Sequence, residues 1–322
     1  MAINNSAVNV YDKATIKWEN EGKKYCVLIQ QDDDFPSSPR DDDDGIFTIM
    51  ATFSKRHRIG DDIGKVDADD FWRDLVRKNV SAKEVYDAVT AGKLKNYRVE
   101  KDADNADLIN FVELDESGRV EYTYEGIHMD ALIDTCAEDF SIMDCKILLH
   151  PHAEWLPIWL YDHSGQTISC AECNPFCDPW DSSLIGWIIA LKDAAMKATG
   201  GVVSVKNAED SGYHTEKMDD NNWRQYVKDV MQSEVQTYKQ WMEGDVYWFK
   251  VFEEAENEED SDPDIPGWKD TDDSCGGFYG SNVRENGMYD SIGYGFDKAI
   301  DSGNYEIGEA ETKTVCRTIY TL

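Results

Sequence analysis

One stretch of the chain, residues 156–191, holds most of the side chains that could do chemistry. Cys170, Cys173 and Cys177 form a C-x2-C-x3-C pattern, and His163 stands seven residues before it. Three thiolates and one imidazole could hold zinc in a tetrahedral site. A zinc ribbon brings a second C-x2-C pair at a distance, and this sequence has none. Reduced thiols in a loop are therefore the preferred interpretation, and zinc is the alternative.

The neighbouring residues Asp162, His163 and Ser164 have the side-chain types of a hydrolase triad. Neighbours on a strand point to opposite faces of a sheet, so these three cannot act together as a triad. Asp162 and Ser164 would share one face, with His163 on the other. A histidine paired with a carboxylate for structural reasons is the simpler interpretation, and a general base is the alternative. The G-x-S-x-G elbow, the P-loop and the dinucleotide-binding glycine pattern are absent.

The chain is strongly acidic, and much of its charge lies in two runs. The 322 residues include 65 Asp and Glu against 32 Lys and Arg, a formal net charge of −33. Residues 32–44 carry −6 and residues 252–273 carry −10. DNA, RNA and anionic lipid repel such a chain, so its expected partners are cations, basic proteins or proteins that hold nucleic acid. Two disordered acidic loops are the simpler interpretation of the runs, and an interaction surface is the alternative.

If the runs form an interaction surface, its members are their clustered carboxylates. They are Asp32, Asp33, Asp34, Asp41, Asp42, Asp43, Asp44, Glu253, Glu254, Glu256, Glu258, Glu259 and Asp260. The first run could also hold Ca²⁺, which prefers clustered oxygen ligands, but it lacks the EF-hand spacing. We therefore expect no cofactor, with zinc and calcium as the alternatives.

The elements that must position these side chains can be read from hydrophobic periodicity and turn residues. In the first half, the pattern predicts strands within 14–31 around a turn at Gly22 and at 45–54, a hairpin within 100–125, and helices at 67–79, 81–93 and 127–140. In the second half, it predicts two strands in 146–163 broken at Pro151 and Pro157, strands at 184–192 and 245–253, a helix at 220–244, and turns with short strands from 275 onward.

These elements predict an α+β fold, with a mixed or mostly antiparallel sheet, packed helices and long acidic loops. The expected organisation is an N-terminal region, 1–145, with acidic loop 32–44, and a C-terminal region, 146–322, with acidic loop 252–273. The two regions could also form one continuous domain. The first residues show no signal-peptide pattern and no window is apolar enough to span a membrane, so the expected location is the cytosol with reduced cysteines.

Three stretches of the sequence resemble one set of motifs. DDDFPSSPRDDDDGIFTIMATFSKRHRIGDD is similar to D-x-x-P-x-x-P-R-x-x-D-N-x-G-x-M-x-x-x-H-x-x-x-x-L-G-D. LPIWLYDHSGQTIS, followed by NPFCDPWDSSLIGWI, is similar to L-Y-D-H-S-G…P-F…P-W-D-S-x-x-x-G-W-I. The segment ending in DSCGGFYG is similar to a D-S-C-x-G-F-Y-G ending. In this order, over about a third of the chain, the motifs resemble a family of hypothetical proteins encoded by bacteriophages and other mobile elements.

The resemblance implies a role in phage or mobile-element biology and no particular reaction. It matches Arg40, His57, Asp162, His163 and Asp181 to positions of the motifs. These side chains would form a polar pocket if the fold brings them together. The letters CAEC look like an insertion relative to the pattern, which weakens the zinc interpretation.

Two classes of function fit these observations. In the first, the chain is a phage-encoded anti-defence protein that binds a host nuclease-based immune complex or another DNA-binding protein. Its acidic surface would mimic nucleic acid, or would block the site where the target binds nucleic acid. It would contact no nucleic acid or membrane itself. In the second, it is an enzyme or ligand-binding protein using a pocket of His163, Asp181 and His57, with or without a metal. A structural or accessory phage protein is a third alternative. The missing catalytic motifs favour the first class.

Overall fold

The chain folds as two compact units, one inserted into the sequence of the other. The computed structural model describes residues 7–34, 37–41, 46–64, 66–102, 105, 107–206, 213–263 and 265–309. Unit 1 consists of Met1–Asp42 and Gln236–Leu322, and unit 2 of Asp43–Val235. Each unit combines helices with antiparallel sheets, which confirms the α+β prediction. None of the helices in the described ranges is long and apolar enough to cross a membrane.

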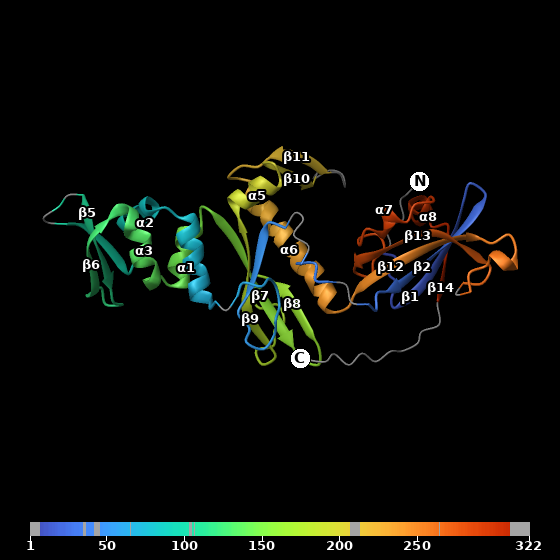
Figure 1. Ribbon diagram of the computed structural model, residues 1–322, viewed down its shortest axis with the longest axis horizontal. Coiled ribbons are helices and arrows are strands. Elements are labelled where there is room, and N and C mark those ends of the chain that lie inside the picture. Colours follow the sequence, from blue (N-terminus) through green and yellow to red (C-terminus); the bar gives the residue numbers. More distant parts are fainter. Residues whose placement is uncertain are drawn as a thin grey trace. The chain divides into compact units, whose positions relative to one another are not determined.

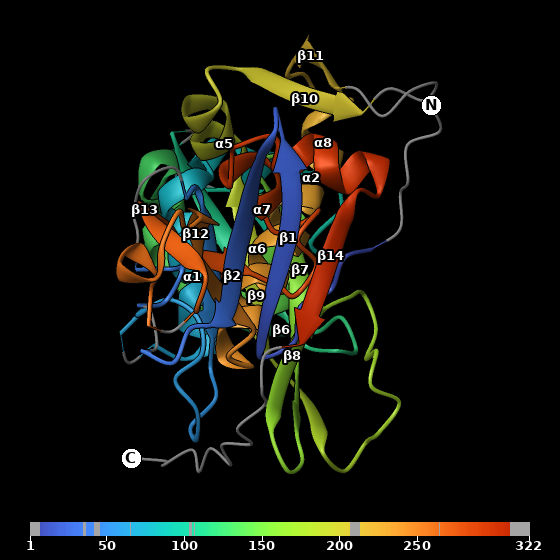
Figure 2. The same ribbon diagram turned by 90° about the vertical axis from the view of Figure 1, so that its right-hand side faces the viewer.

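Unit 1 is built on a five-stranded antiparallel sheet with the order β13–β12–β2–β1–β14 (Figures 1 and 2). Its strands are β1 (Lys13–Asn20), β2 (Lys23–Gln31), β12 (Val246–Glu254), β13 (Trp268–Tyr279) and β14 (Tyr305–Glu309). The blue strands from the start of the chain lie beside orange and red strands from its end. β1 and β2 meet at a tight turn where Gly22 has φ +80°, a conformation that glycine adopts at no steric cost.

One face of this sheet is covered by two short helices, α7 (Met288–Ser291) and α8 (Phe296–Ser302). Alternate residues of the strands point to that face, as the period of a strand requires. Ile16 and Trp18 of β1 and Val27 of β2 are buried there against Phe296 and Ile300. Burial of these large side chains holds the helices on the sheet.

The other face is covered by the connection between β12 and β13. Cys26, Leu28 and Phe252 are buried on that face, and Ile265 of the connection and Trp268 at the start of β13 pack against them. The buried environment raises the pKa of the Cys26 thiol to about 11. The connection is thus a folded cover and not a solvated loop.

This arrangement corrects the prediction of an acidic loop over 252–273. Its first three residues end β12 and its last six, from Trp268, begin β13, so only 255–267 joins the strands. Phe252 is 1% exposed and Trp268 packs beside it. The high charge of the run predicts a solvated loop, whereas its few apolar side chains decide that it folds onto the sheet.

Unit 2 contains three antiparallel sheets. The four-stranded sheet has the order β3–β9–β7–β8, with β3 (Thr48–Thr52), β7 (Ala153–Asp162), β8 (Gln166–Cys170) and β9 (Ser182–Leu191). The others are β4 (Tyr97–Lys101), β5 (Leu108–Leu114) and β6 (Val120–His128), and the pair β10 (Val202–Lys206) and β11 (Tyr213–Lys217). The helices are α1 (Ala68–Asn79), α2 (Ala82–Thr90), α3 (Leu132–Cys136), α4 (Ile142–Leu149), α5 (Lys192–Ala198) and α6 (Trp223–Met242), which ends in unit 1.

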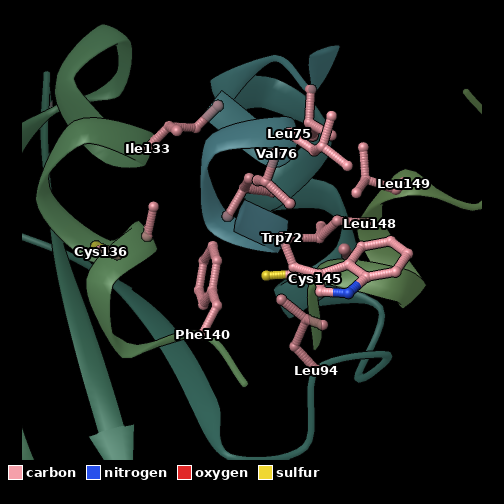
Figure 3. Close-up of a cluster of buried hydrophobic side chains, with 14 of the residues drawn as sticks. Trp72, Leu75, Val76, Leu94, Ile133, Cys136, Phe140, Cys145, Leu148 and Leu149 are labelled. Carbon is pink, nitrogen blue, oxygen red and sulfur yellow. The ribbon is translucent and has the colours of Figure 1, made fainter. Parts of the chain in front are cut away.

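The helices of unit 2 form a core that joins them to the four-stranded sheet. Figure 3 shows Trp72, Leu75 and Val76 of α1 gathered with Leu148 and Leu149 of α4. These positions lie on one face of each helix, as amphipathic spacing predicts. Both helices begin at a side-chain cap: α1 at Asp67, and α4 at Ser141, which forms a capping box with Asp144.

The segment 146–163 differs from its prediction as two strands broken at Pro151 and Pro157. Its start belongs to α4, and β7 runs without interruption through Pro157. A proline lacks the N–H needed in the middle of a sheet but is tolerated at an edge. β8 pairs with β7 only from Ile158 to Asp162, so Pro157 lies where β7 has one strand neighbour, β9.

The two units do not follow the predicted boundary between residues 145 and 146. That position falls inside unit 2, where β3 pairs with β9 from Thr48↔Ala190 to Thr52↔Gly186. The predicted helix at 127–140 is also wrong in detail: it is divided into the end of β6, α3 and two short 3₁₀ segments. The pairing of distant strands is a tertiary property, and local patterns carry little information about it.

Candidate functional site

The residues expected to form a polar pocket meet at the turn between β7 and β8. Asp162 ends β7 and Gln166 begins β8, and the two residues face each other across the pair. His163, Ser164 and Gly165 make the turn, in which Ser164 has φ +52° and the His163 N–H donates to Gly165 O (3.2 Å). The sequence Asp-His-Ser-Gly therefore forms a tight turn, so the three side chains do not alternate across a strand.

His57 reaches this turn from the segment that follows β3. The Oγ atom of Ser54 accepts the backbone N–H of His57 (3.3 Å). Gly60 has φ +83°, and a Cβ there would stand 2.4 Å from Met50 O, so only glycine lets the segment return along β3. The carboxylate of Asp61 accepts the Met50 N–H (2.8 Å), which closes the loop.

The imidazole of His57 is held by two side chains of the turn. Its Nε2 lies 3.0 Å from Asp162 Oδ2, and its Nδ1 lies 2.7 Å from Gln166 Nε2. In the tautomer that carries its proton on Nε2, the ring accepts from the Gln166 amide at Nδ1 and donates to Asp162 at Nε2. The side chain of His57 is 17% exposed and that of Asp162 is 41% exposed, so only the imidazole is largely shielded. The contribution of Gln166 was not anticipated, because an isolated glutamine carries no sequence signal.

The second pair is His163 with Asp181, and it is more exposed. Nδ1 of His163 lies 3.0 Å from Asp181 Oδ2, and the side chains are 63% and 35% exposed. The backbone O of Asp181 accepts the Asp162 N–H (2.8 Å), which joins the second pair to the first. A carboxylate at Nδ1 orients an imidazole so that Nε2 can accept a proton, the arrangement of a general base.

Of the five residues expected to form the pocket, four lie at this turn and Arg40 does not, and their role as a functional site stays a prediction. The structure brings His57, Asp162, His163 and Asp181 to one turn, but as two separate pairs. Arg40 belongs to unit 1, where its backbone N–H donates to Ser38 Oγ (3.1 Å). The two pairs line neither of the cavities at the four-stranded sheet. They form a polar surface at the turn.

The cysteines of the C-x2-C-x3-C pattern lie at the end of β8 and in the loop that follows. Cys173 and Cys177 are exposed, whereas burial raises the pKa of the Cys170 thiol to about 11 and so opposes a thiolate there. Within the described ranges, no three His, Cys, Asp or Glu side chains gather as metal ligands. Zinc at these residues stays a prediction.

The 171–181 loop is ordered by its own polar groups. The side chain of Asn174 bonds to Ser182 Oγ (2.6 Å) and accepts the Phe176 N–H (3.0 Å). Asp178 Oδ1 accepts the N–H of Trp180 (2.9 Å), whose side chain is 93% exposed. The indole of Trp180 therefore lies at the surface.

The two acidic runs lie at opposite ends of the unit 1 sheet. The first run leaves β2 where the Asp32 N–H bonds to Val246 O (2.7 Å), at the start of β12. The second surrounds the other end of β12, beside the start of β2. At about 3.3 Å per residue, a strand as long as β2 puts them roughly 25 Å apart. Asp42, Asp43 and Asp44 lie outside the described residues, and calcium binding by this run stays a prediction.

The carboxylates of the second run divide into a paired and an unpaired group. Glu254 pairs with Lys24 (2.6 Å) and Glu253 approaches Lys269 (3.9 Å). By contrast, no ion pair with a described residue is formed by the exposed side chains of Glu256, Glu258, Glu259 and Asp260. We call these four residues the acidic tip.

The acidic tip has a defined backbone. A 3₁₀ helix spans Glu258–Asp260, and Asn257 Oδ1 accepts the N–H groups of Glu259 (3.1 Å) and Asp260 (3.1 Å). The Ala255 N–H donates to Gly267 O (3.0 Å) at the base of the connection. The four carboxylates therefore project from a folded scaffold.

Comparisons with protein-family models, with curated proteins and with solved structures gave no match to this chain. The resemblance to phage-encoded proteins consequently stays a prediction. Any functional argument must start from the sites themselves.

Proposed function

We propose that this protein is an inhibitor that binds a basic, nucleic-acid-binding surface of a host defence nuclease. The acidic tip would occupy part of the groove that normally receives phosphates, and the net charge of −33 would speed association. Support for a phage setting comes from the motif resemblance. The protein would act in the host cytosol and need no cofactor.

The observation that carries this proposal is the unpaired acidic tip on a folded hairpin. Carboxylates fixed to a scaffold lose less entropy on binding than those of a disordered loop, so more of their attraction to Lys and Arg becomes affinity. The neighbouring acids Glu253 and Glu254 are already engaged with lysines of the same sheet. The acidic tip thus gathers four unpaired carboxylates in one short segment, while Asp272 and Asp273 of β13 are exposed and also form no ion pair with a described residue.

The test is capture of partners from lysates of bacteria that carry nuclease-based defences, followed by binding to the purified partner. We expect a nuclease to be captured at low salt and released at high salt. A variant with Glu256→Gln, Glu258→Gln, Glu259→Gln and Asp260→Asn should bind the partner about tenfold more weakly or worse. It should fold normally, because exposed unpaired charges contribute little to stability.

A matched variant removes the same charge from unit 2. It carries Glu116→Gln, Glu121→Gln, Glu125→Gln and Asp130→Asn, all at exposed side chains. If this variant weakens binding as much as the tip variant does, net charge and not the tip is responsible. Failure of the wild-type protein to bind or inhibit any nuclease would overturn the proposal.

A second candidate function rests on the His163–Asp181 pair. An exposed imidazole oriented by a carboxylate can serve as a general base for a small substrate. His163→Asn and Asp181→Asn would then abolish turnover without a change in melting temperature. The same variants would leave nuclease binding intact if the acidic tip is the functional surface.

A further inference from the structure

A cavity of about 410 Å³ opens in unit 2, away from both sites described above. It lies beside the part of β7 where Pro157 stands and β8 no longer pairs. Because the sheet loses a strand at this point, side chains of β7, β9 and α4 surround an open space. Its walls include Trp155, Trp159 and Trp187.

Lys146 of α4 lines this cavity in an unusual environment. Its Nζ atom lies 4.5 Å from the ring centroid of Trp187, 4.9 Å from that of Trp72 and 5.8 Å from that of Trp155. The ammonium group is thus held against three indole rings. Among the described residues, no carboxylate forms an ion pair with it. Burial lowers the pKa of Lys146 below its ordinary value.

Two acidic residues line the cavity: Glu172 is exposed at its edge, and Glu154 is already neutralised. Glu154 bonds to Arg224 (2.5 Å) and approaches Lys228 (3.3 Å), and its side chain is 15% exposed. Lys228 also lines the cavity. This wall therefore offers a positive charge without a partner, in a chain whose net charge is strongly negative.

We infer that this cavity binds a small ligand in which a planar aromatic ring carries a carboxylate or phosphate group. The ring would lie against the indole of Trp159, which lines the cavity and is not covered by Lys146, and stacking of aromatic faces is favourable there. The acidic group would pair with the ammonium group of Lys146 in a partly dry site, where charge-assisted hydrogen bonds are strong. The volume of this cavity falls within the range of small-molecule sites.

A cationic ligand fits this cavity less well. Aromatic cages do bind quaternary ammonium groups, but here the ammonium group of Lys146 already occupies the indole faces. A cation would have to displace it and would also approach Lys228. The geometry therefore favours an anion.

Two aromatic anions, indole-3-acetate and adenosine monophosphate, can be titrated into the full-length protein. Indole-3-acetamide and tetramethylammonium serve as the neutral and cationic comparisons. Binding is measured by equilibrium dialysis and by the fluorescence of the tryptophans. We expect saturable binding of at least one anion, and binding at least tenfold weaker for the neutral analogue. Which anion binds distinguishes a carboxylate ligand from a nucleotide.

Three variants locate the binding. Lys146→Met removes the charge, and Leu184→Trp fills the cavity from an exposed position of β9. Both should weaken anion binding at least tenfold. Lys78→Met removes an exposed lysine of α1 and should have no effect. Lys146→Met should be at least as stable as wild type, because it removes a charge that burial disfavours.

The alternative outcomes are decisive. If tetramethylammonium binds and neither anion does, the cavity is a cage for cations and the inference is wrong. It is equally wrong if no probe binds in a saturable manner, or if Lys146→Met and Leu184→Trp bind the anions as wild type does.

Discussion

The β12–β13 hairpin of unit 1 and the β7–β8 hairpin of unit 2 both carry acidic side chains, yet they use them differently. At the β7–β8 turn, Asp162 and Asp181 each face a histidine at 3.0 Å. At the acidic tip, four carboxylates face no cation of the described chain. The difference teaches that carboxylate density and carboxylate pairing are separate properties. Several carboxylates close together without cations form a surface that a partner can contact, whereas a carboxylate paired with a histidine positions the imidazole.

The largest expected effect comes from disturbing the sheet that carries the β7–β8 turn. Gly186 of β9 stands between β3 and β7, and a Cβ there would lie 2.0 Å from Ala51 O. Gly186→Ala should therefore destabilise unit 2 by about 3 kcal/mol, since a backbone atom cannot move away easily. Denaturant unfolding measures this loss, and a change below about 1 kcal/mol would mean that the β3–β9 contact is looser than described.

An intermediate effect is expected from the paired acids of the unit 1 hairpin. Lys250 Nζ lies 2.5 Å from Asp270 Oδ2 and 3.8 Å from Asp262 Oδ2. Lys250→Met leaves two carboxylates together and should cost about 1 to 2 kcal/mol at pH 7. Urea unfolding of the two proteins in parallel gives the difference.

This difference should depend on pH in a defined direction. The hydrogen bond from Lys250 lowers the pKa of Asp270 below its ordinary value of 3.8. The stabilisation is therefore fully present above the unfolded-state pKa and is lost as the pH falls through the lower folded-state pKa. The wild type and Lys250→Met should therefore converge in stability at a pH below the folded-state pKa of Asp270. A difference that stays constant down to this pH would show that the lost interaction is not ionic.

The smallest effects should separate the two histidine pairs. Asp162→Ala removes the partner of a histidine that is 17% exposed and should cost about 1 kcal/mol. Asp181→Ala removes the partner of one that is 63% exposed and should cost less than about 0.5 kcal/mol. Thermal melting of both variants at one pH tests the order. A reversed order would mean that Asp181 is the structural residue and Asp162 the accessible one.

Local signals in the sequence predicted local structure well. The hairpin at Gly22 and the helices expected at 67–79 and 81–93 are all present, as β1–β2, α1 and α2. Each of these features is determined by residues that are neighbours in the sequence and by backbone geometry. Pro157 misled the prediction because its tolerance depends on a strand, β8, that stops one residue short of it.

The sequence predicts a candidate site better when its residues lie close together in the chain. The His163–Asp181 pair lies within one turn-rich segment, and both residues were expected. Gln166 became a partner of His57 only through the pairing of β7 with β8. The environment of Lys146 was not foreseen, because its three indoles come from α1, β7 and β9. Such sites follow from tertiary packing, which a single sequence does not encode in local patterns.

The insertion of unit 2 into unit 1 has a consequence for how the chain folds as it is synthesised. The side chain of Gln31 at the end of β2 bonds to Gly244 O, a residue 213 positions later. The β1–β2 hairpin thus leaves the ribosome long before β12 exists, with Val27 and Ile29 still without their cover. Unit 2 is complete first, and pairing of such distant strands is slow. The apolar face of the β1–β2 hairpin stays uncovered until the last third of the chain has been synthesised. During this interval chaperones would recognise the protein.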